Sequence, residues 1–469
     1  MKQYKYNKVE RLFKAWLALM MVGMMPALTS CSDDEDYQST TMTISKVFLE
    51  DANAKDEVYD REVTFARLGQ LLRIEGSGFT GLKKIYVNGF ETYFNNALMT
   101  DNNVWVTLNT KTPVDKADAS VRNTITFVKD QTQTVYQFTI RAAAPSIASV
   151  DNTLPYPGEK VVVYGSNLQE TTKVTLPGGV EVTDGIENDE DGKWFSFTMP
   201  EGVTACGSIT SEGANGTAMS PAFFNNNDCF IINFDGKGAQ GSWSATFSAD
   251  DLVDDPLASG RGKVIQIIPE SVLAEGPVAA GISNLKGFWT AGNDNADDDW
   301  NRMTAFISAA TPVDSVALQF DVLCEDEWDL SGQIAITLQN NLSNYGYGSA
   351  CTKYSESLLN QAYAWVPWLD RETGEHKAFT TGRRWQTITI PLSEFGNYTN
   401  TEKAWTFQNV IDDRNAGSYR NFGLLFCNAD VKWNTDLEDA DYPATPFSKK
   451  IYFDNFRIVP ITAITVSDY

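Results

Sequence analysis

Residues 69–89 read GQLLRIEGSGFTGLKKIYVNG, and residues 158–178 read GEKVVVYGSNLQETTKVTLPG. The two segments align without a gap, with matching glycines at their start, middle and end and a Gly-Ser pair in each. Self-similarity at a fixed offset is typical of tandem copies of one folding unit. Each copy alternates apolar and polar residues, passes through a glycine-rich turn and alternates again, which predicts two strands joined by a turn. The sequence therefore predicts two tandem β domains.

The spacing G-x-x-x-x-[VI]-x-G-S-[GN]-[FL] resembles the opening of IPT/TIG domains, an immunoglobulin-like family. A unit of this size made of short strands is consistent with an Ig-like sandwich. We place the first Ig-like domain at residues 43–142 and the second at 143–225, with the joint at AAAP, residues 142–145. The resemblance implies that both act as spacers before a binding domain.

Residues 226–469 differ in composition, because nine of the twelve tryptophans lie at or after Trp243. Short apolar runs separated by long polar loops predict a single larger β-sandwich or jelly roll, with no convincing amphipathic helix. The expected strands are 230–234, 263–268, 316–322, 333–338, 385–390, 421–426 and 450–459. The runs FDG (234–236) and YFDNFR (452–457) resemble carbohydrate-binding jelly rolls, whose first and last strands lie side by side. The fold class is all-β throughout.

The first thirty residues predict a targeting signal. Five basic residues precede an apolar stretch, 15–28, that is too short to span a bilayer. The run LTSC, residues 28–31, resembles the lipobox of bacterial lipoproteins, which implies cleavage before Cys31 and acylation (palmitate included) of that residue. The acidic run after Cys31, in a tether over 31–42, resembles a surface-export signal, so we expect a lipid-anchored protein exposed on the outer membrane. An ordinary secretory signal and a plain disordered tether are the alternatives.

The chain is acidic, with 61 acidic and 37 basic residues and a net charge of −24. The electrostatic field of so negative a protein repels nucleic acid and anionic lipid, whereas it does not affect the binding of a neutral polysaccharide. The single histidine, His376, argues against zinc sites built on several histidines and against Ser-His or Cys-His triads. Five cysteines follow Cys31 without a CxxC spacing, so they are expected as small buried side chains, and their disulfide pairing stays open.

Four aromatic side chains are the candidate glycan contacts: Trp328, Tyr363, Trp365 and Trp368. In an extended segment Tyr363 and Trp365 project from the same face, and Trp368 follows the strand-ending Pro367. Trp328 lies in a charged loop, where a large apolar ring is unexpected unless it binds something. The apolar faces of sugar rings stack on such rings.

Together, the leader, the Ig-like repeats and the C-terminal region resemble the B-type surface glycan-binding proteins of polysaccharide-utilisation loci. The resemblance implies binding of a neutral plant-type polysaccharide, such as xyloglucan, mixed-linkage β-glucan or mannan. It matches Trp328 and the Tyr363–Trp365 pair to an aromatic platform, although here Ala364 splits the pair. It also implies a SusD-like protein and a TonB-dependent transporter as partners.

Two other classes remain open: a glycoside hydrolase, which needs two carboxylates at a set separation, and a structural or adhesive stalk. We predict no catalytic residues and no cofactor. Calcium is an alternative at Asp297–Asp299 or at Asp235 with Asp454, but a solvated charge run is the simpler interpretation. Of the other tryptophans, Trp385 and Trp405 lie in regular strand-like runs and are expected to pack in the core. Trp289, Trp300 and Trp433 lie in loops and are alternative site-lining residues.

Overall fold

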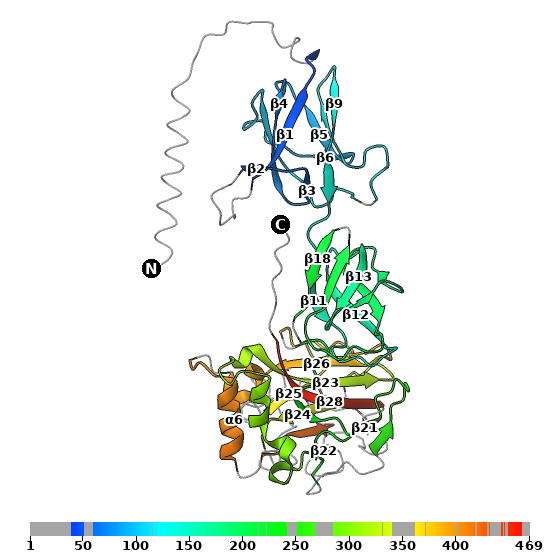
Figure 1. Cartoon of the computed structure of the whole chain (residues 1–469), viewed down its shortest axis with the longest axis vertical. Helices are drawn as coiled ribbons and strands as arrows, with labels where there is room; N and C mark the ends of the chain where they lie inside the picture. The colour runs from blue at the N-terminus through cyan, green and yellow to red at the C-terminus, as the bar shows by residue number, and fades with distance from the viewer. Residues whose placement is uncertain are drawn as a thin grey trace. The chain divides into compact units, whose positions relative to one another are not determined.

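The computed structural model describes residues 39–461 with several gaps. Left out are 51–59, 115, 214, 222, 242–250, 268–284, 331, 340–361, 371, 400–401, 418–419 and most of 429–448. The chain divides into two compact units, Met1–Ala142 and Ala143–Tyr469. Nearly all of its regular elements are strands in antiparallel sheets (Figure 1), which confirms the all-β fold class. None of the helices in these ranges is long and apolar enough to cross a membrane.

The first unit contains the first Ig-like domain, a sandwich whose strands alternate buried and solvent-facing residues. In β4, Leu72 and Ile74 are fully buried, as are Ile85 and Val87 of β5 in the opposite sheet. One sheet has the order β2(Asp60–Glu62), β1(Thr43–Glu50), β4(Leu71–Ser77), β7(Asn103–Thr107), and the other β6(Phe90–Thr92), β5(Lys84–Val87), β8(Thr124–Val128), β9(Gln133–Gln137). The strands β3(Phe65–Arg67) and β10(Thr139–Arg141) add a parallel pair.

The second Ig-like domain repeats this arrangement. Its first sheet has the order β11(Ser146–Val150), β12(Lys160–Ser166), β16(Trp194–Thr198), β15(Glu187–Asn188). Its second sheet has the order β14(Val180–Val182), β13(Thr171–Leu176), β17(Thr210–Gly213), β18(Gly216–Met219). The tandem repeat predicted from the sequence is therefore a pair of sandwiches with equivalent strands.

The repeated glycine in the middle of each motif has the same structural cause in both copies. A Cβ on Gly76 would lie 2.0 Å from the carbonyl oxygen of Thr43, and one on Gly165 would lie 1.8 Å from that of Ser146. The strand register shifts at both places, as in a β-bulge. Only glycine fits such a close backbone approach, so the repeated glycine indicates a bulge that both domains share.

The C-terminal domain is a larger sandwich of two sheets. The first has the order β20(Leu252–Asp254), β21(Lys263–Ile267), β28(Ile451–Pro460), β23(Val316–Cys324), β26(Gln386–Pro391), and β19(Phe230–Ile232) also pairs with β28. The second has the order β22(Leu285–Trp289), β27(Gly423–Cys427), β24(Gln333–Thr337), β25(Ala362–Trp365). Each predicted strand is present, and the pairing of the first strand with the last is confirmed. A core of aliphatic and aromatic side chains fills the space between the sheets.

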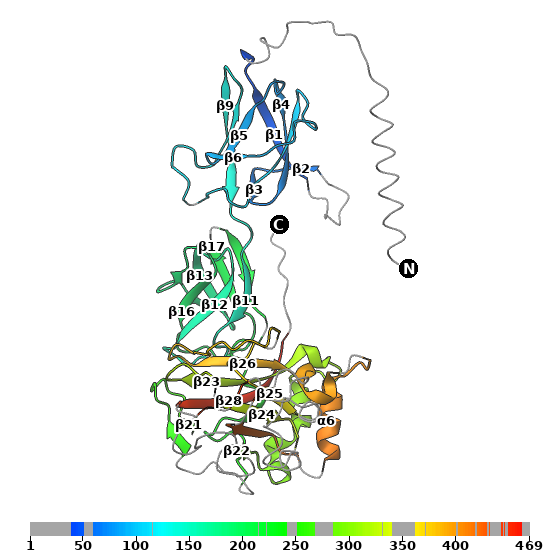
Figure 2. The ribbon, with the colours of Figure 1, turned by 180° about the vertical axis from the view of Figure 1, so that it is seen from behind.

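One helix contradicts the expectation that this domain has none. The helix α6(Phe407–Ala416) lies at one end of the sandwich (Figure 2) and buries Phe407, Val410, Ile411 and Arg414. These positions follow the helical spacing i, i+3, i+4, i+7. Because the last of them is an arginine, the apolar pattern is incomplete and does not predict a helix. Short 3-10 helices cover Gly292–Asp294, Ala296–Asp298, Trp300–Ala305, Val313–Ser315, Leu392–Glu394 and Gly396–Tyr398.

Candidate functional site

The structure brings three of the predicted contact residues together, but it buries them. The rings of Trp328 and Trp365 meet edge to face with their centroids 5.7 Å apart. Trp328 is fully buried, and only 2% of Trp368 and 9% of Trp365 are exposed. The prediction that these three indoles form a solvent-facing platform is therefore wrong. We call Trp328, Trp365 and Trp368 the inner indoles.

Backbone pairing explains why Trp328 lies inside despite its charged neighbours. Its N–H donates to the carbonyl of Phe379 at 2.8 Å, and its own carbonyl accepts from the N–H of Phe379 at 2.9 Å. This isolated bridge places the indole between the two sheets. Trp365 lies on the core face of β25, edge to face with Phe320 at 5.2 Å between centroids. The indole N–H of Trp368 donates to the carbonyl of Gly332 at 2.8 Å.

A layer of more exposed rings lies beside the inner indoles. Phe379 meets Trp365 edge to face at 5.7 Å, and Tyr442 meets Trp368 in the same way at 5.6 Å. The fourth predicted contact residue, Tyr363, is half-buried on β25 and packs on Phe395. With His376, these residues form the set that we call the outer rings: Tyr363, His376, Phe379 and Tyr442.

A short hairpin, described over residues 368–370 and 372–377, carries His376. The N–H of Lys377 donates to the carbonyl of Trp368 at 2.8 Å, and Leu369 is bridged to His376. In the turn, the carboxylate of Asp370 accepts hydrogen bonds from the N–H groups of Thr373 and Glu372, which lower the pKa of Asp370. Hydrogen bonds from the turn's own backbone N–H groups to the Asp370 carboxylate therefore stabilise the turn.

Tyr442, which is distant from this hairpin in the sequence, contacts it through a hydrogen bond and a ring contact. Its hydroxyl donates to the carbonyl of Gly374 at 2.6 Å, and its ring lies edge to face with His376 at 5.9 Å. The Nδ1 atom of His376 lies 3.2 Å from a carboxylate oxygen of Asp329, and 47% of the histidine side chain is exposed. Ring surfaces next to a carboxylate suit a sugar, whose apolar faces stack while its hydroxyl groups donate hydrogen bonds.

The acidic groups considered for calcium make contacts within the protein, although one buried oxygen of Asp298 and one of Asp454 accept no hydrogen bond. The carboxylate of Asp235 accepts from the backbone N–H of Lys263 at 3.0 Å. Asp298 is buried, which raises its pKa to about 6. Within the described ranges, no three histidine, cysteine or acidic side chains are grouped as a metal site would need. The absence of a cofactor stays a prediction.

Sequence reasoning missed Tyr442 and the role of the hairpin, because the partner of each is distant in the chain. The unusual position of the single histidine in a charged turn was the only available signal. Among the other tryptophans, Trp289 and Trp300 are buried, contrary to the idea that they line a site, and Trp385 packs as expected. Trp405 is half-buried against the core, whereas Cys31 and Trp433 lie outside the described residues.

Comparison with known proteins agrees with a carbohydrate-binding role. Residues 224–460 match the family model of the xyloglucan-binding domain of surface glycan-binding protein B. A solved structure of a surface glycan-binding protein B from Prevotella bryantii shares the fold, with a TM-score of 0.61, 20% identity and coverage of 90% of this chain and 100% of that one. A similar protein from a xyloglucan utilisation locus of Bacteroides uniformis has the same identity and coverage, with a TM-score of 0.47.

A curated relative from Bacteroides ovatus, an IPT/TIG domain-containing protein, is 27% identical over 193 residues. That alignment covers 41% of this chain and 36% of the relative, so it spans about a third of the relative's length. The family model, by contrast, covers half of the chain. This protein therefore belongs to the surface glycan-binding protein B family, whose members are non-catalytic proteins of the cell surface that bind polysaccharides.

Proposed function

We propose that the protein captures a neutral plant-type polysaccharide by stacking sugar rings on the outer rings of its C-terminal domain. The observation that carries this proposal is the exposed ring of His376, which lies beside the carboxylate of Asp329 and meets the half-buried ring of Tyr442. The inner indoles give that surface a closely packed base, so little conformational entropy is lost when a sugar binds. Tyr363 remains a proposed contact from β25.

A β-linked glucan or mannan is the ligand class we propose, with xyloglucan and mixed-linkage glucan as the first candidates. The acidic chain, with a net charge of −24, favours an uncharged ligand. The name of the matching family model favours a xyloglucan-type backbone. A few ring stacks and hydrogen bonds correspond to affinities in the millimolar to micromolar range, and many copies on one surface compensate for weak single contacts.

The experiment is affinity electrophoresis of the mature chain in gels that contain xyloglucan, mixed-linkage glucan, galactomannan or the acidic polymer polygalacturonate. We expect retardation by at least one neutral polymer and none by the acidic one. Retardation by polygalacturonate alone would contradict the ligand class, and no retardation in any gel would contradict capture of these glycans. His376→Ala tests the site in the same gels. The matched control is Tyr93→Ala, because Tyr93 is an 81% exposed aromatic residue of the first Ig-like domain.

We further propose that a lipid on Cys31 tethers the protein to the outer membrane and that it acts beside a SusD-like protein and a TonB-dependent transporter. The basis is the lipobox-like run LTSC before the acidic tether. Cys31→Ala should release the protein from the membrane fraction and abolish labelling by palmitate. Membrane retention of that variant would contradict the lipid anchor without bearing on glycan binding. Co-purification from cells grown on the bound glycan tests the two partners.

A further inference from the structure

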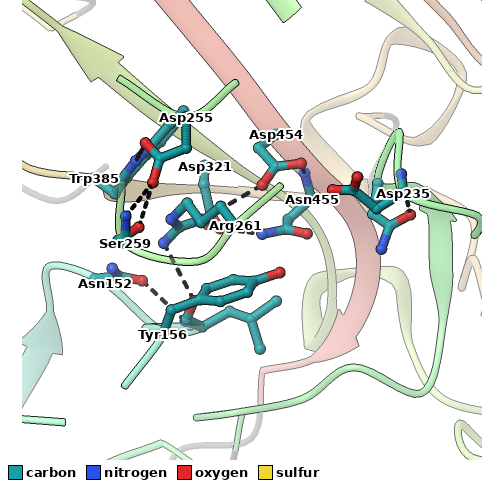
Figure 3. A network of polar contacts seen from close by, with 12 residues as sticks. Asn152, Tyr156, Asp235, Asp255, Ser259, Arg261, Asp321, Trp385, Asp454 and Asn455 are labelled. Atoms are coloured by element: carbon teal, nitrogen blue, oxygen red, sulfur yellow. Dashed lines mark hydrogen bonds and ion pairs between the residues drawn. The ribbon is translucent and has the colours of Figure 1, made fainter. Parts of the chain in front are cut away.

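The loop 151–159 joins β11 to β12 in the second Ig-like domain, and it inserts polar groups into the C-terminal domain (Figure 3). We propose that these two domains form one rigid module that unfolds cooperatively, because this loop completes a buried charge network of the C-terminal domain. The second Ig-like domain is then part of the recognition module and not a detachable spacer. The proposal concerns the fold and does not depend on the glycan-binding site.

Arg261 of the C-terminal domain is the centre of the contact. Its side chain is fully buried, and its Nε and one terminal nitrogen donate to the two carboxylate oxygens of Glu159 at 2.9 and 3.0 Å. Its other terminal nitrogen donates to Asp321 of β23 at 2.7 Å. The guanidinium also lies 4.9 Å from the ring centroid of Tyr156 and 4.7 Å from that of Trp385. Groups from both domains thus surround one cation.

Arg457 of β28 forms a second link. One terminal nitrogen donates to Asp321 at 3.2 Å, and the other donates to the hydroxyl oxygen of Thr153 at 3.0 Å. The same hydroxyl donates to the side-chain oxygen of Gln319 at 3.1 Å. One side chain of the second Ig-like domain therefore satisfies two buried groups on neighbouring strands of the C-terminal sheet.

Glu159 supplies one of three carboxylates that lie against the two buried guanidinium groups, beside Asp321 and Asp454. Burial alone would raise the pKa of Asp321, but Arg457 and Arg261 outweigh it, so its pKa is lowered. Burial raises the pKa of Asp454 well above its usual value, which favours its uncharged form. Asp321 and Glu159 make the hydrogen-bonded contacts with the two guanidinium groups, whereas Asp454 lies 3.7 Å from Arg261. Removing one partner from a buried ion pair leaves an uncompensated charge, which is strongly destabilising.

Backbone and apolar contacts extend the interface beyond the charges. The N–H of Thr387 donates to the carbonyl of Asp151 at 2.7 Å, and the N–H of Thr153 donates to the hydroxyl of Thr387 at 2.9 Å. The carboxylate of Asp151 also pairs with Arg384 at 2.7 Å. Nearby, Phe223 packs in a small apolar cluster with β23 and β28. Such an interface couples the stabilities of its two sides, because neither can open without exposing buried polar groups.

Differential scanning calorimetry of the mature full chain without glycan tests this proposal. We expect residues 143–461 to melt in a single transition. Glu159→Ala should lower its midpoint by about 5 °C or more, or split it in two. The matched control is Glu187→Gln, which removes an exposed ion pair with Lys160 in the same domain and should leave the midpoint nearly unchanged. Separate transitions for the two domains in the unmodified protein, or equal effects of both variants, would overturn the proposal.

Hydrogen exchange with the milder variant Thr153→Val keeps the test decisive if Glu159→Ala does not fold. This substitution keeps the side-chain shape and removes the hydroxyl that serves Arg457 and Gln319. We expect faster amide exchange in β23 and β28 as well as in β11 and β12. Faster exchange confined to the second Ig-like domain would overturn the proposal. Since neither readout involves a ligand, a failure here is distinguishable from a failure of glycan binding.

Discussion

The inner indoles and the outer rings of the C-terminal domain are made of similar side chains, yet they differ in depth and in task. Trp328 is held inside by a backbone bridge to Phe379, whereas His376 is carried outward on a hairpin. The difference teaches that an aromatic residue in a charged loop is not evidence of exposure. The backbone contacts of the loop decide whether the ring supports the site or forms its surface.

The largest expected effect is on stability, from truncating an inner indole. Trp328→Ala should lower the free energy of unfolding by about 3–5 kcal/mol, because it leaves a cavity between the two sheets. Urea unfolding followed by fluorescence measures this loss, with Tyr93→Ala as the control expected to be near neutral. A loss below about 1 kcal/mol would mean that Trp328 does not support the core as described.

The next effect is on affinity, from truncating an outer ring. Tyr442→Ala should weaken glycan binding by about 1–3 kcal/mol, because it removes a ring surface and the bond that holds Gly374. Isothermal titration with the glycan selected by the gel panel measures the change, and near-ultraviolet circular dichroism checks the fold. If Tyr442→Ala binds as tightly as Tyr93→Ala, the outer rings are not the binding surface.

A conservative change at an inner indole distinguishes the structural role of the inner indoles from the binding role of the outer rings. Trp368→Phe keeps an aromatic ring but removes the N–H that donates to Gly332, which should cost about 1–2 kcal/mol of stability. Affinity should change less than it does in Tyr442→Ala. The opposite result, unchanged stability with lost affinity, would show that Trp368 itself contacts the sugar.

The smallest expected effect is a dependence of glycan binding on pH. The N–H groups of Thr373 and Glu372 lower the pKa of Asp370, so this carboxylate stabilises the hairpin above its unfolded-state pKa. That contribution is lost as the pH falls through the lowered pKa, below about pH 4. Binding of a neutral glycan should therefore weaken at low pH, and Asp370→Asn should flatten this part of the titration profile. An identical profile in both proteins would remove Asp370 from the account.

Much of the fold could be predicted from the sequence because its signals are local. The repeat at residues 69–89 and 158–178 encodes a bulge and two strands, and both domains have them. The helix α6 was missed because Arg414 occupies a buried position on its apolar face. Its guanidinium lies over the ring of Trp300 at 3.8 Å, and this is a tertiary contact that no local pattern reveals.

The site and the interface between domains were harder to predict because they depend on residues far apart in the chain. Tyr442 meets a turn at Gly374, and Glu159 meets Arg261. Asp321 and Arg457 are buried charged residues of the C-terminal sheet, and Arg457 donates to Thr153 of the second Ig-like domain. Charged residues on a sheet face can therefore indicate a partner domain as readily as they indicate water.

The most direct test of the account is isothermal titration of the double variant His376→Ala, Tyr442→Ala against the neutral polysaccharide that retards the unmodified protein. The account predicts an affinity at least about tenfold weaker, which is about 1.4 kcal/mol, with the C-terminal sandwich still folded by circular dichroism. An affinity equal to that of the unmodified protein, with the fold intact, would contradict the claim that the glycan lies on the outer rings.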